Sequence, residues 1–283
     1  MTSNIEMVAR YEGHPNYKVV KTDNLYYRYL YFNLDGRTTE NQGLLEDTRV
    51  RRALVHALDK RTIIDKIYGR FAIVLDSGIL PDDAWHVPKS REQVGYDPDK
   101  AIQLLKEAGY DFDRTIVLTR YSQDEASIKL LEEIARYWNA VGVKTEIISI
   151  DTMVSNQLWV DTDWYDICLK NLAAVNYDEW YNEYDSGNEL WSEVMQNRNG
   201  FDQTIDHIDQ ASWAYEKEFL YRELQNLETQ LVYKIPLATI PQYIIYRKEK
   251  LHIPEMDFPN MWYYFDLNIS RWSLEKKGWE TGQ

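Results

Sequence analysis

Strand-like and helix-like segments alternate through the middle of the chain, and this alternation limits the fold more than any other feature. The segments predicted as strands are short and rich in β-branched or aromatic residues: Tyr26–Asn33, Thr115–Thr119, Val143–Ile150 and Asp166–Leu172. The segments predicted as helices have apolar residues at helical spacing: 47–58, 59–69, 97–109, 122–141 and 211–232. Strands separated by helices need crossover connections, so we expect an α/β lobe.

The remaining segments are less regular. Lys18–Lys21 and Leu237–Tyr246 have the composition of strands, and Pro236 and Pro241 limit the second of them. Leu75–Arg91 holds a glycine and two prolines and is predicted to be a loop. Asn176–Phe201 is polar and aromatic without a clear period, and loops are expected from Lys250 onward.

The charge balance excludes several kinds of partner. The 283 residues include 32 Lys and Arg against 46 Asp and Glu, for a net charge of −14. A chain this acidic repels nucleic acid and anionic lipid, so neither is expected as a partner. No apolar run approaches the roughly 20 residues that span a bilayer, so we expect no membrane insertion of this segment.

Residues that carry metal or catalytic chemistry are sparse. Cys168 is the single cysteine and is predicted to be a buried apolar residue. The five histidines are too far apart for metal-ligand spacing, so no metal and no cofactor is expected. Asp178 and Glu179 are neighbours, which makes them a poor pair for glycoside hydrolysis. The sequence therefore favours a protein that is not an enzyme.

Five stretches carry a recognisable pattern. Asp47–Ile64 reads DTRVRRALVHALDKRTII, and Tyr96–Tyr110 reads YDPDKAIQLLKEAGY. Three shorter stretches accompany them in order: Tyr29–Asn33, Trp138–Val143, and Phe219–Leu224 with the later Ile235-Pro236. The two long stretches are the specific ones, because each fixes many positions at once.

In this order, the stretches resemble extracellular solute-binding protein family 5, the oligopeptide/dipeptide/nickel type of ABC-importer binding protein. The resemblance implies the second lobe of a type II, cluster C periplasmic-binding-protein-like fold, with a mixed sheet flanked by helices. It also implies a C-terminal segment that returns toward a first lobe. That first lobe is expected to be missing, so we expect residues 1–28 to be its remnant, 29–235 to form the ligand-binding lobe, and 236–283 to cross back.

The resemblance also implies a function. The chain would be the substrate-binding component of an ABC importer, capturing oligopeptides or dipeptides at the extracellular face of the membrane or in the periplasm. Its expected partners are a peptide or small-molecule ligand and the ABC permease subunits, and it is expected to be a monomer. Two alternatives stay open, an oligosaccharide-binding member of the family and a ligand-sensing domain without transport.

The resemblance points to ligand contacts in two places. Peptide binders of the family hold the peptide's amino group with an acid in the loop after a strand, and that position falls here on Val175. Valine cannot bind an ammonium group, although Asp178 could substitute if the loop is shifted. Some dipeptide binders hold the ligand's carboxylate with an arginine that Arg120 matches within about one residue, and arginine suits this task through its bidentate geometry.

Aromatic side chains crowd the same loop region. Their faces can stack on sugars or pack on apolar side chains, and the neighbouring polar residues can bond hydroxyl groups. They can equally pack against the protein itself. The candidate ligand-binding residues are Arg120, Asn176, Tyr177, Asp178, Trp180 and Tyr181, with Tyr184 and Trp191 close by in sequence.

Overall fold

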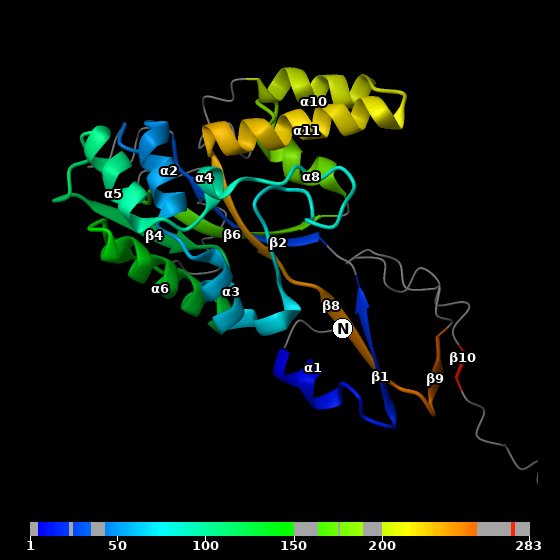
Figure 1. Cartoon of the computed structure of the whole chain (residues 1–283). Helices are drawn as coiled ribbons and strands as arrows, with labels where there is room; N and C mark the ends of the chain where they lie inside the picture. Colours follow the sequence, from blue (N-terminus) through cyan, green and yellow to red (C-terminus); the bar gives the residue numbers. More distant parts are fainter. Residues whose placement is uncertain are drawn as a thin grey trace, which may run out of the picture.

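The main body of the chain is a mixed β-sheet with helices on both faces (Figure 1). The computed structural model describes residues 5–22, 25–34, 43–149, 164–174, 176–188, 200–253 and 273–274. Among these residues the sheet has six strands, in the order β3 (Ile73–Val74), β7 (Lys234–Thr239), β2 (Leu25–Phe32), β6 (Ile167–Ala174), β4 (Thr115–Arg120) and β5 (Lys144–Ile147). The predicted α/β class and mixed sheet are confirmed.

Strand β2 runs through the middle of this sheet. It pairs antiparallel with β6 on one side and with β7 on the other. Tyr27, Tyr29 and Tyr31 alternate with Arg28 and Leu30, and all five side chains are buried. Alternate residues of a strand point to opposite faces, so the tyrosines and the Arg28 side chain lie on different faces of the sheet. The prediction of a buried strand here is confirmed.

One face of the sheet is covered by α3 (Lys60–Tyr68) and α6 (Glu125–Ala140), beside α2 (Thr48–His56) and α5 (Pro98–Glu107). An aspartate begins each of these helices and accepts a hydrogen bond from a backbone N–H of the first turn. Such caps satisfy donors that have no partner inside the helix. The predicted starts at Asp47, Asp59 and Asp97-Pro98 are therefore confirmed.

The opposite face carries α8 (Tyr177–Tyr181), the 3-10 turn η3 (Asn182–Tyr184), α10 (Phe201–Gln210) and α11 (Ala214–Leu231). The sequence predicts only α11, and three residues too early. Helix α8 is too short to show a helical period, and Asn176 starts it by accepting a hydrogen bond from the Glu179 N–H. Three further short elements lie elsewhere: α1 (Ile5–Tyr11), α4 (Arg91–Val94) and the 3-10 turn η1 (Gly69–Phe71).

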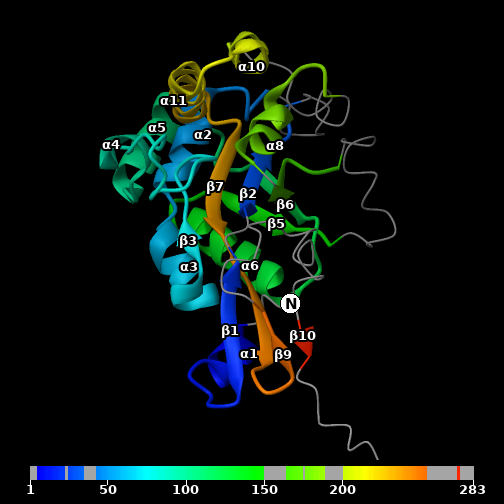
Figure 2. The same cartoon turned by 90° about the vertical axis from the view of Figure 1, so that its right-hand side faces the viewer.

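The strand-like segment Leu237–Tyr246 is divided between two strands, because the chain changes sheets at Ile240-Pro241. Residues before the break form β7, and those after it form β8 (Gln242–Arg247), which pairs with β1 (Tyr17–Thr22) in a separate ribbon. Pro241 has no N–H to donate to a neighbouring strand, and the chain passes there from one sheet to the other. Pro236, by contrast, lies inside β7 opposite Tyr29. The ribbon projects from the sheet with α1 beside it (Figures 1 and 2).

Beyond the ribbon, β9 (Leu251–His252) pairs with β10 (Ser273–Leu274). The six-stranded sheet includes β7 up to Thr239 and β2 from Leu25. The division into 1–28, 29–235 and 236–283 stays a prediction, and much of its last part lies outside the described residues. No helix in the described part of the chain is long and apolar enough to cross a membrane.

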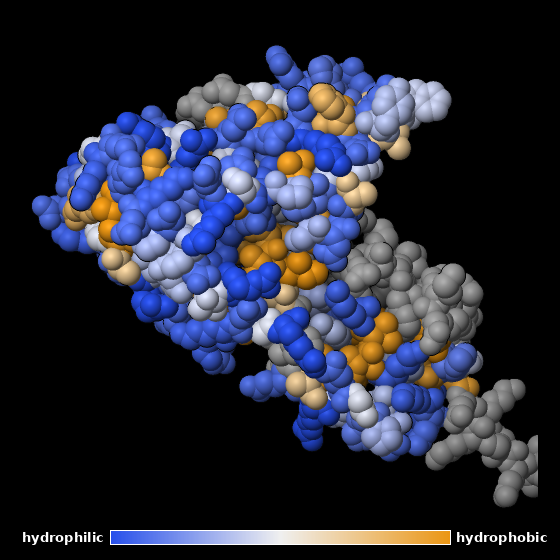
Figure 3. Space-filling view, in the orientation of Figure 1, coloured by the Kyte–Doolittle hydropathy of each residue, from blue (hydrophilic) through white to orange (hydrophobic). Residues whose placement is uncertain are grey.

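The core lies between the sheet and its two helical layers. Cys168 is fully buried in β6, as predicted, and burial raises the pKa of its thiol to about 12. On the face drawn in Figure 3, polar residues cover most of the surface, and apolar residues gather where the body meets the ribbon.

Candidate functional site

The edge of the sheet next to the ribbon is the first candidate for a ligand site. Strands β4, β5, β6 and β7 run in one direction and β2 runs opposite to them, so four carboxyl ends lie on the same side of the sheet as the start of β2. The ribbon strands continue from β2 and β7 at the same edge. In open α/β sheets, ligands bind beyond the carboxyl ends of the strands. We call this region the carboxyl edge.

Arg120 is the last residue of β4 and lies at the carboxyl edge. Its side chain is 6% exposed, and its Nη2 donates to Gln123 Oε1 and Ser149 Oγ, both at 3.0 Å. Its Nε is buried and has no hydrogen-bond partner among the described residues. A guanidinium fixed by neutral groups, with a spare donor, is suited to bind an anion.

Arg28 and Asn171 also belong to this edge, although the sequence did not single them out. They are register partners across β2 and β6. Arg28 Nε donates to Tyr68 Oη at 3.4 Å, and its guanidinium carbon lies 4.4 Å from the centre of the Tyr26 ring. Within the described part of the chain, Arg28 Nη1 and Asn171 Oδ1 are buried without a hydrogen-bond partner. The pair therefore offers one unused donor and one unused acceptor.

The three side chains point to the same face of the sheet. Arg28 pairs with Asn171, while Arg120 pairs with Leu169, which is two residues before Asn171 on β6. Register partners, and residues two apart on one strand, share a face. With strands about 4.8 Å apart and about 3.3 Å of rise per residue, the Cα atoms of Arg28 and Arg120 lie roughly 12 Å apart.

A sequence signal for Arg28 does exist. It is a cation within the aromatic strand Tyr26–Phe32, and buried cations in strands are rare unless they have a partner or a ligand. Asn171 likewise interrupts the apolar run of β6. Neither residue lies in the five stretches that resemble the family.

The candidate ligand-binding residues at the start of α8 form contacts that anchor this helix. Asn176 caps it, and Tyr177 Oη donates to Asp83 Oδ2 at 2.9 Å. Asp178 accepts a hydrogen bond from the Tyr221 hydroxyl on α11. Val175, at the position of the peptide-binding acid, and Trp191 lie outside the described residues. Asn176 is exposed and Tyr177 and Asp178 are half-buried, so these three can still meet a ligand.

Trp180 and Tyr181, two of the candidate ligand-binding residues, are buried. Their side chains are 0% and 1% exposed, and both donate to the carboxylate of Glu228, at 2.6 and 2.9 Å. Trp180 also packs on Tyr27, with ring centroids 4.5 Å apart. In this structure the two side chains form part of the core between α8, α11 and the sheet.

A buried group of charges lies beneath the same helix. The carboxylate of Glu183 bonds Lys170 Nζ at 2.9 Å, Lys234 Nζ at 2.6 Å and the Tyr29 hydroxyl at 2.9 Å. Burial lowers the pKa of Lys234 to about 8. Burial by itself would raise the pKa of Glu183, but the charges of Lys170 and Lys234 hold it below its usual value. All these polar groups are satisfied, so the cluster has a structural role.

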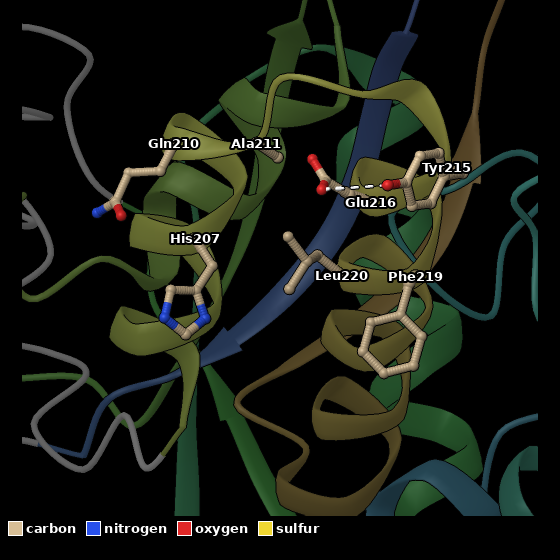
Figure 4. A pocket seen from close by; sticks show the side chains of 7 residues that line it. All are labelled: His207, Gln210, Ala211, Tyr215, Glu216, Phe219 and Leu220. Atoms are coloured by element: carbon tan, nitrogen blue, oxygen red, sulfur yellow. Dashed lines mark hydrogen bonds between the residues drawn. The ribbon is translucent and has the colours of Figure 1, made fainter.

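A separate pocket of about 570 Å³ lies between α10 and α11, away from the carboxyl edge. In Figure 4, His207 from α10 faces Leu220 and Phe219 from α11 across it. Its walls are mainly apolar, and Phe219 is 61% exposed. None of the residues predicted for ligand binding lines this pocket. No group of three or more possible metal ligands occurs in the described ranges.

Comparison with known proteins decides the family. The model of "Bacterial extracellular solute-binding proteins, family 5 Middle" matches residues 2–189, which is more than half of the chain. The chain belongs to this family. Two curated relatives of this family-5 chain are the dipeptide-binding protein of Escherichia coli, 27% identical over 148 residues, and heme-binding protein A of Haemophilus influenzae, 28% identical over 152 residues.

The solved structures agree on the fold. The ABC transporter substrate-binding protein CtaP of Listeria monocytogenes is 18% identical, with a TM-score of 0.75 over 92% of this chain and 52% of its own. The matches to the two curated relatives cover 51% and 52% of this chain, but only 26% of each relative. The chain thus spans about a quarter of those relatives and about half of the solved structure.

Proposed function

We propose that this family-5 chain is the ligand-binding lobe of the substrate-binding component of an ABC importer, and that Arg120 holds an anionic group of the ligand. The observation that carries this proposal is the position of Arg120. It is buried at the carboxyl edge, fixed by Gln123 and Ser149, and retains an unused Nε donor. A peptide's terminal carboxylate is an anion of the right size and geometry for such a donor.

The ligand class that we propose is a dipeptide or short oligopeptide. The dipeptide-binding relative supports this class, while the heme-binding relative shows that close relatives differ in ligand. Asp178 could still meet the peptide's amino group, but its carboxylate already accepts a hydrogen bond from Tyr221. We therefore place more weight on the carboxylate end of the ligand than on its amino end.

The remaining predicted residues take two roles in this proposal. Asn176, Tyr177 and Asp178 have exposed surface and are proposed to contact the ligand directly. Trp180 and Tyr181 are buried, so they are proposed to hold α8 in place beneath the site. The chain is proposed to act at the extracellular face of the membrane or in the periplasm and to deliver its ligand to an ABC permease in the membrane.

An oligosaccharide is the second candidate ligand. It is favoured by the aromatic side chains around α8 and by the valine at the position where peptide binders of the family carry an acid. Most of these aromatic rings are buried in the described part of the chain, which leaves few faces for stacking on a sugar. We therefore keep the peptide as the preferred ligand.

Arg120→Met is expected to abolish binding of alanyl-alanine while leaving the fold intact, because methionine keeps the apolar stem and removes the donors. The measurement is a thermal-shift titration of the chain with alanyl-alanine, and a ligand that binds the native state raises the unfolding temperature. The matched control is Arg222→Met, which removes an exposed guanidinium on α11.

Two results would count against this proposal. Stabilisation by maltose or other oligosaccharides, without stabilisation by any peptide, would replace the peptide with a sugar. Equal stabilisation of the wild-type chain and Arg120→Met by alanyl-alanine would remove Arg120 from the site.

A further inference from the structure

We propose that Arg28 is a second anion-binding residue at the carboxyl edge, and that it selects ligands carrying a second carboxylate beside the one that Arg120 holds. This inference rests on the proposed function, because it takes Arg120 as the first anchor. It adds a residue that no family motif marks, and it narrows the ligand class to dicarboxylates.

The first support is the way in which Arg28 is held. Tyr68 accepts a hydrogen bond from its Nε, and the Tyr26 ring lies beneath the guanidinium at 4.4 Å. These contacts fix the plane of the guanidinium but leave Nη1 buried with no partner in the described ranges. Buried donors almost always have a partner, so an unused one that is rigidly held is a place for a bound water, an ion or a ligand group.

The second support is the charge around the two arginines. Arg28 and Arg120 are each 6% exposed, and neither forms an ion pair with a carboxylate of the described residues. The positive charge of Arg28 is one of the causes that lower the pKa of the nearby Asp124 carboxyl, after its hydrogen bonds from Ser122 and Ser127. Its oxygens, however, accept hydrogen bonds from Ser122 and Ser127 at the start of α6. Two cations on one face of the sheet, neither in an ion pair with a carboxylate of the described residues, favour binding of a dianionic ligand.

The third support is the spacing of the groups. Both guanidinium groups lie on one face of the sheet, on strands separated by β6, with Asn171 between them. Asn171 Oδ1 is an unused acceptor, which suits an N–H of the ligand. A peptide that ends in glutamate offers all three groups: two carboxylates and an amide N–H. A free diacid such as glutarate offers only the two carboxylates.

The experiment compares ligands that differ by one charge. The chain is titrated with alanyl-glutamate and with alanyl-glutamine, which have the same shape, and the thermal shift is measured for each. Glutarate and its monoamide form a second matched pair, which separates a peptide source of the second carboxylate from a free diacid. The variants are Arg28→Met and, as the exposed control, Arg222→Met.

We expect alanyl-glutamate to bind the wild-type chain at least tenfold more tightly than alanyl-glutamine. Arg28→Met should remove this preference and leave the affinity for alanyl-glutamine unchanged. Without ligand, Arg28→Met is expected to unfold at a lower temperature than the wild type, because it loses the contacts of Arg28 with Tyr68 and Tyr26. The peptide affinities decide its role: if Arg28 had only a structural role, the affinities for alanyl-glutamate and alanyl-glutamine would fall together.

The outcomes separate this inference from the proposed function. Equal affinity of the wild-type chain for the two peptides, or no shift with any of the four ligands, overturns the role of Arg28. The wild type could bind alanyl-glutamate and alanyl-glutamine equally, while Arg120→Met loses alanyl-glutamine binding. In that case the role of Arg120 stands, and only the role of Arg28 is rejected. A preference for glutarate over its monoamide, without any peptide binding, upholds Arg28 and rejects the peptide.

Discussion

Glu183→Gln is expected to destabilise the chain by about 3–5 kcal/mol, since it leaves two lysines in the core without their counter-charge. Glu183 is 4% exposed and bonds both Lys170 and Lys234, and Lys234 is itself 2% exposed. Glutamine keeps the shape of glutamate and removes only the charge. The free energy of unfolding, measured by urea titration with circular dichroism, reports the effect.

Glu218→Gln is the matched control for this substitution. Glu218 pairs with Arg222 on the surface of α11, and both side chains are about two-fifths exposed, at 42% and 40%. Exposed ion pairs contribute about 0–1 kcal/mol, so the control should unfold almost as the wild type does. A loss below about 1 kcal/mol for Glu183→Gln would show that the buried lysines find other partners or lose their protons easily.

Trp180→Ala is expected to destabilise the chain by about 3–5 kcal/mol, because it empties a large volume in the core. The indole packs on Tyr27 and Tyr29, and its Nε1–H donates to Glu228. The same urea titration measures the loss. Trp213→Ala removes an indole that is 63% exposed and should change stability by less than about 0.5 kcal/mol.

This pair of variants also decides the role of Trp180. A Trp180→Ala chain that keeps its stability but loses ligand binding would make this residue a direct ligand contact. If Trp180→Ala lowers the stability of the chain as well as ligand binding, Trp180 supports the site from the core, as its burial indicates.

The elements with a long period were predictable from the sequence. The apolar spacing predicted both α5 and α6, and Asp97-Pro98 predicted the start of α5, whereas α6 begins three residues later than expected, at Glu125. The family and the α/β class followed from the motifs on α2, α3 and α5. These features depend on residues that are close together in the sequence, so they can be predicted from the sequence alone.

The parts that failed depend on long-range contacts. Helix α8 spans five residues and is held by Glu228, which lies 48 residues from Trp180 in the sequence. The break at Pro241 was visible, but its consequence, a switch of β8 into a ribbon with β1, requires residues more than 200 positions apart. The pairing of Arg28 with Asn171 across β2 and β6 is equally non-local. Without the strand register, the residue that lies beside Arg28 on the next strand cannot be predicted.

The most direct test of ligand binding at the carboxyl edge is the NMR signal of the Arg120 Nε–Hε group during titration with alanyl-alanine. This donor is buried and unused in the described part of the chain. We predict that its proton signal moves downfield on addition of the peptide, as a charge-assisted hydrogen bond forms, and that alanyl-alanine amide leaves it in place. An Arg120 signal that does not respond to the free carboxylate, while the peptide binds elsewhere on the chain, would contradict the proposed site.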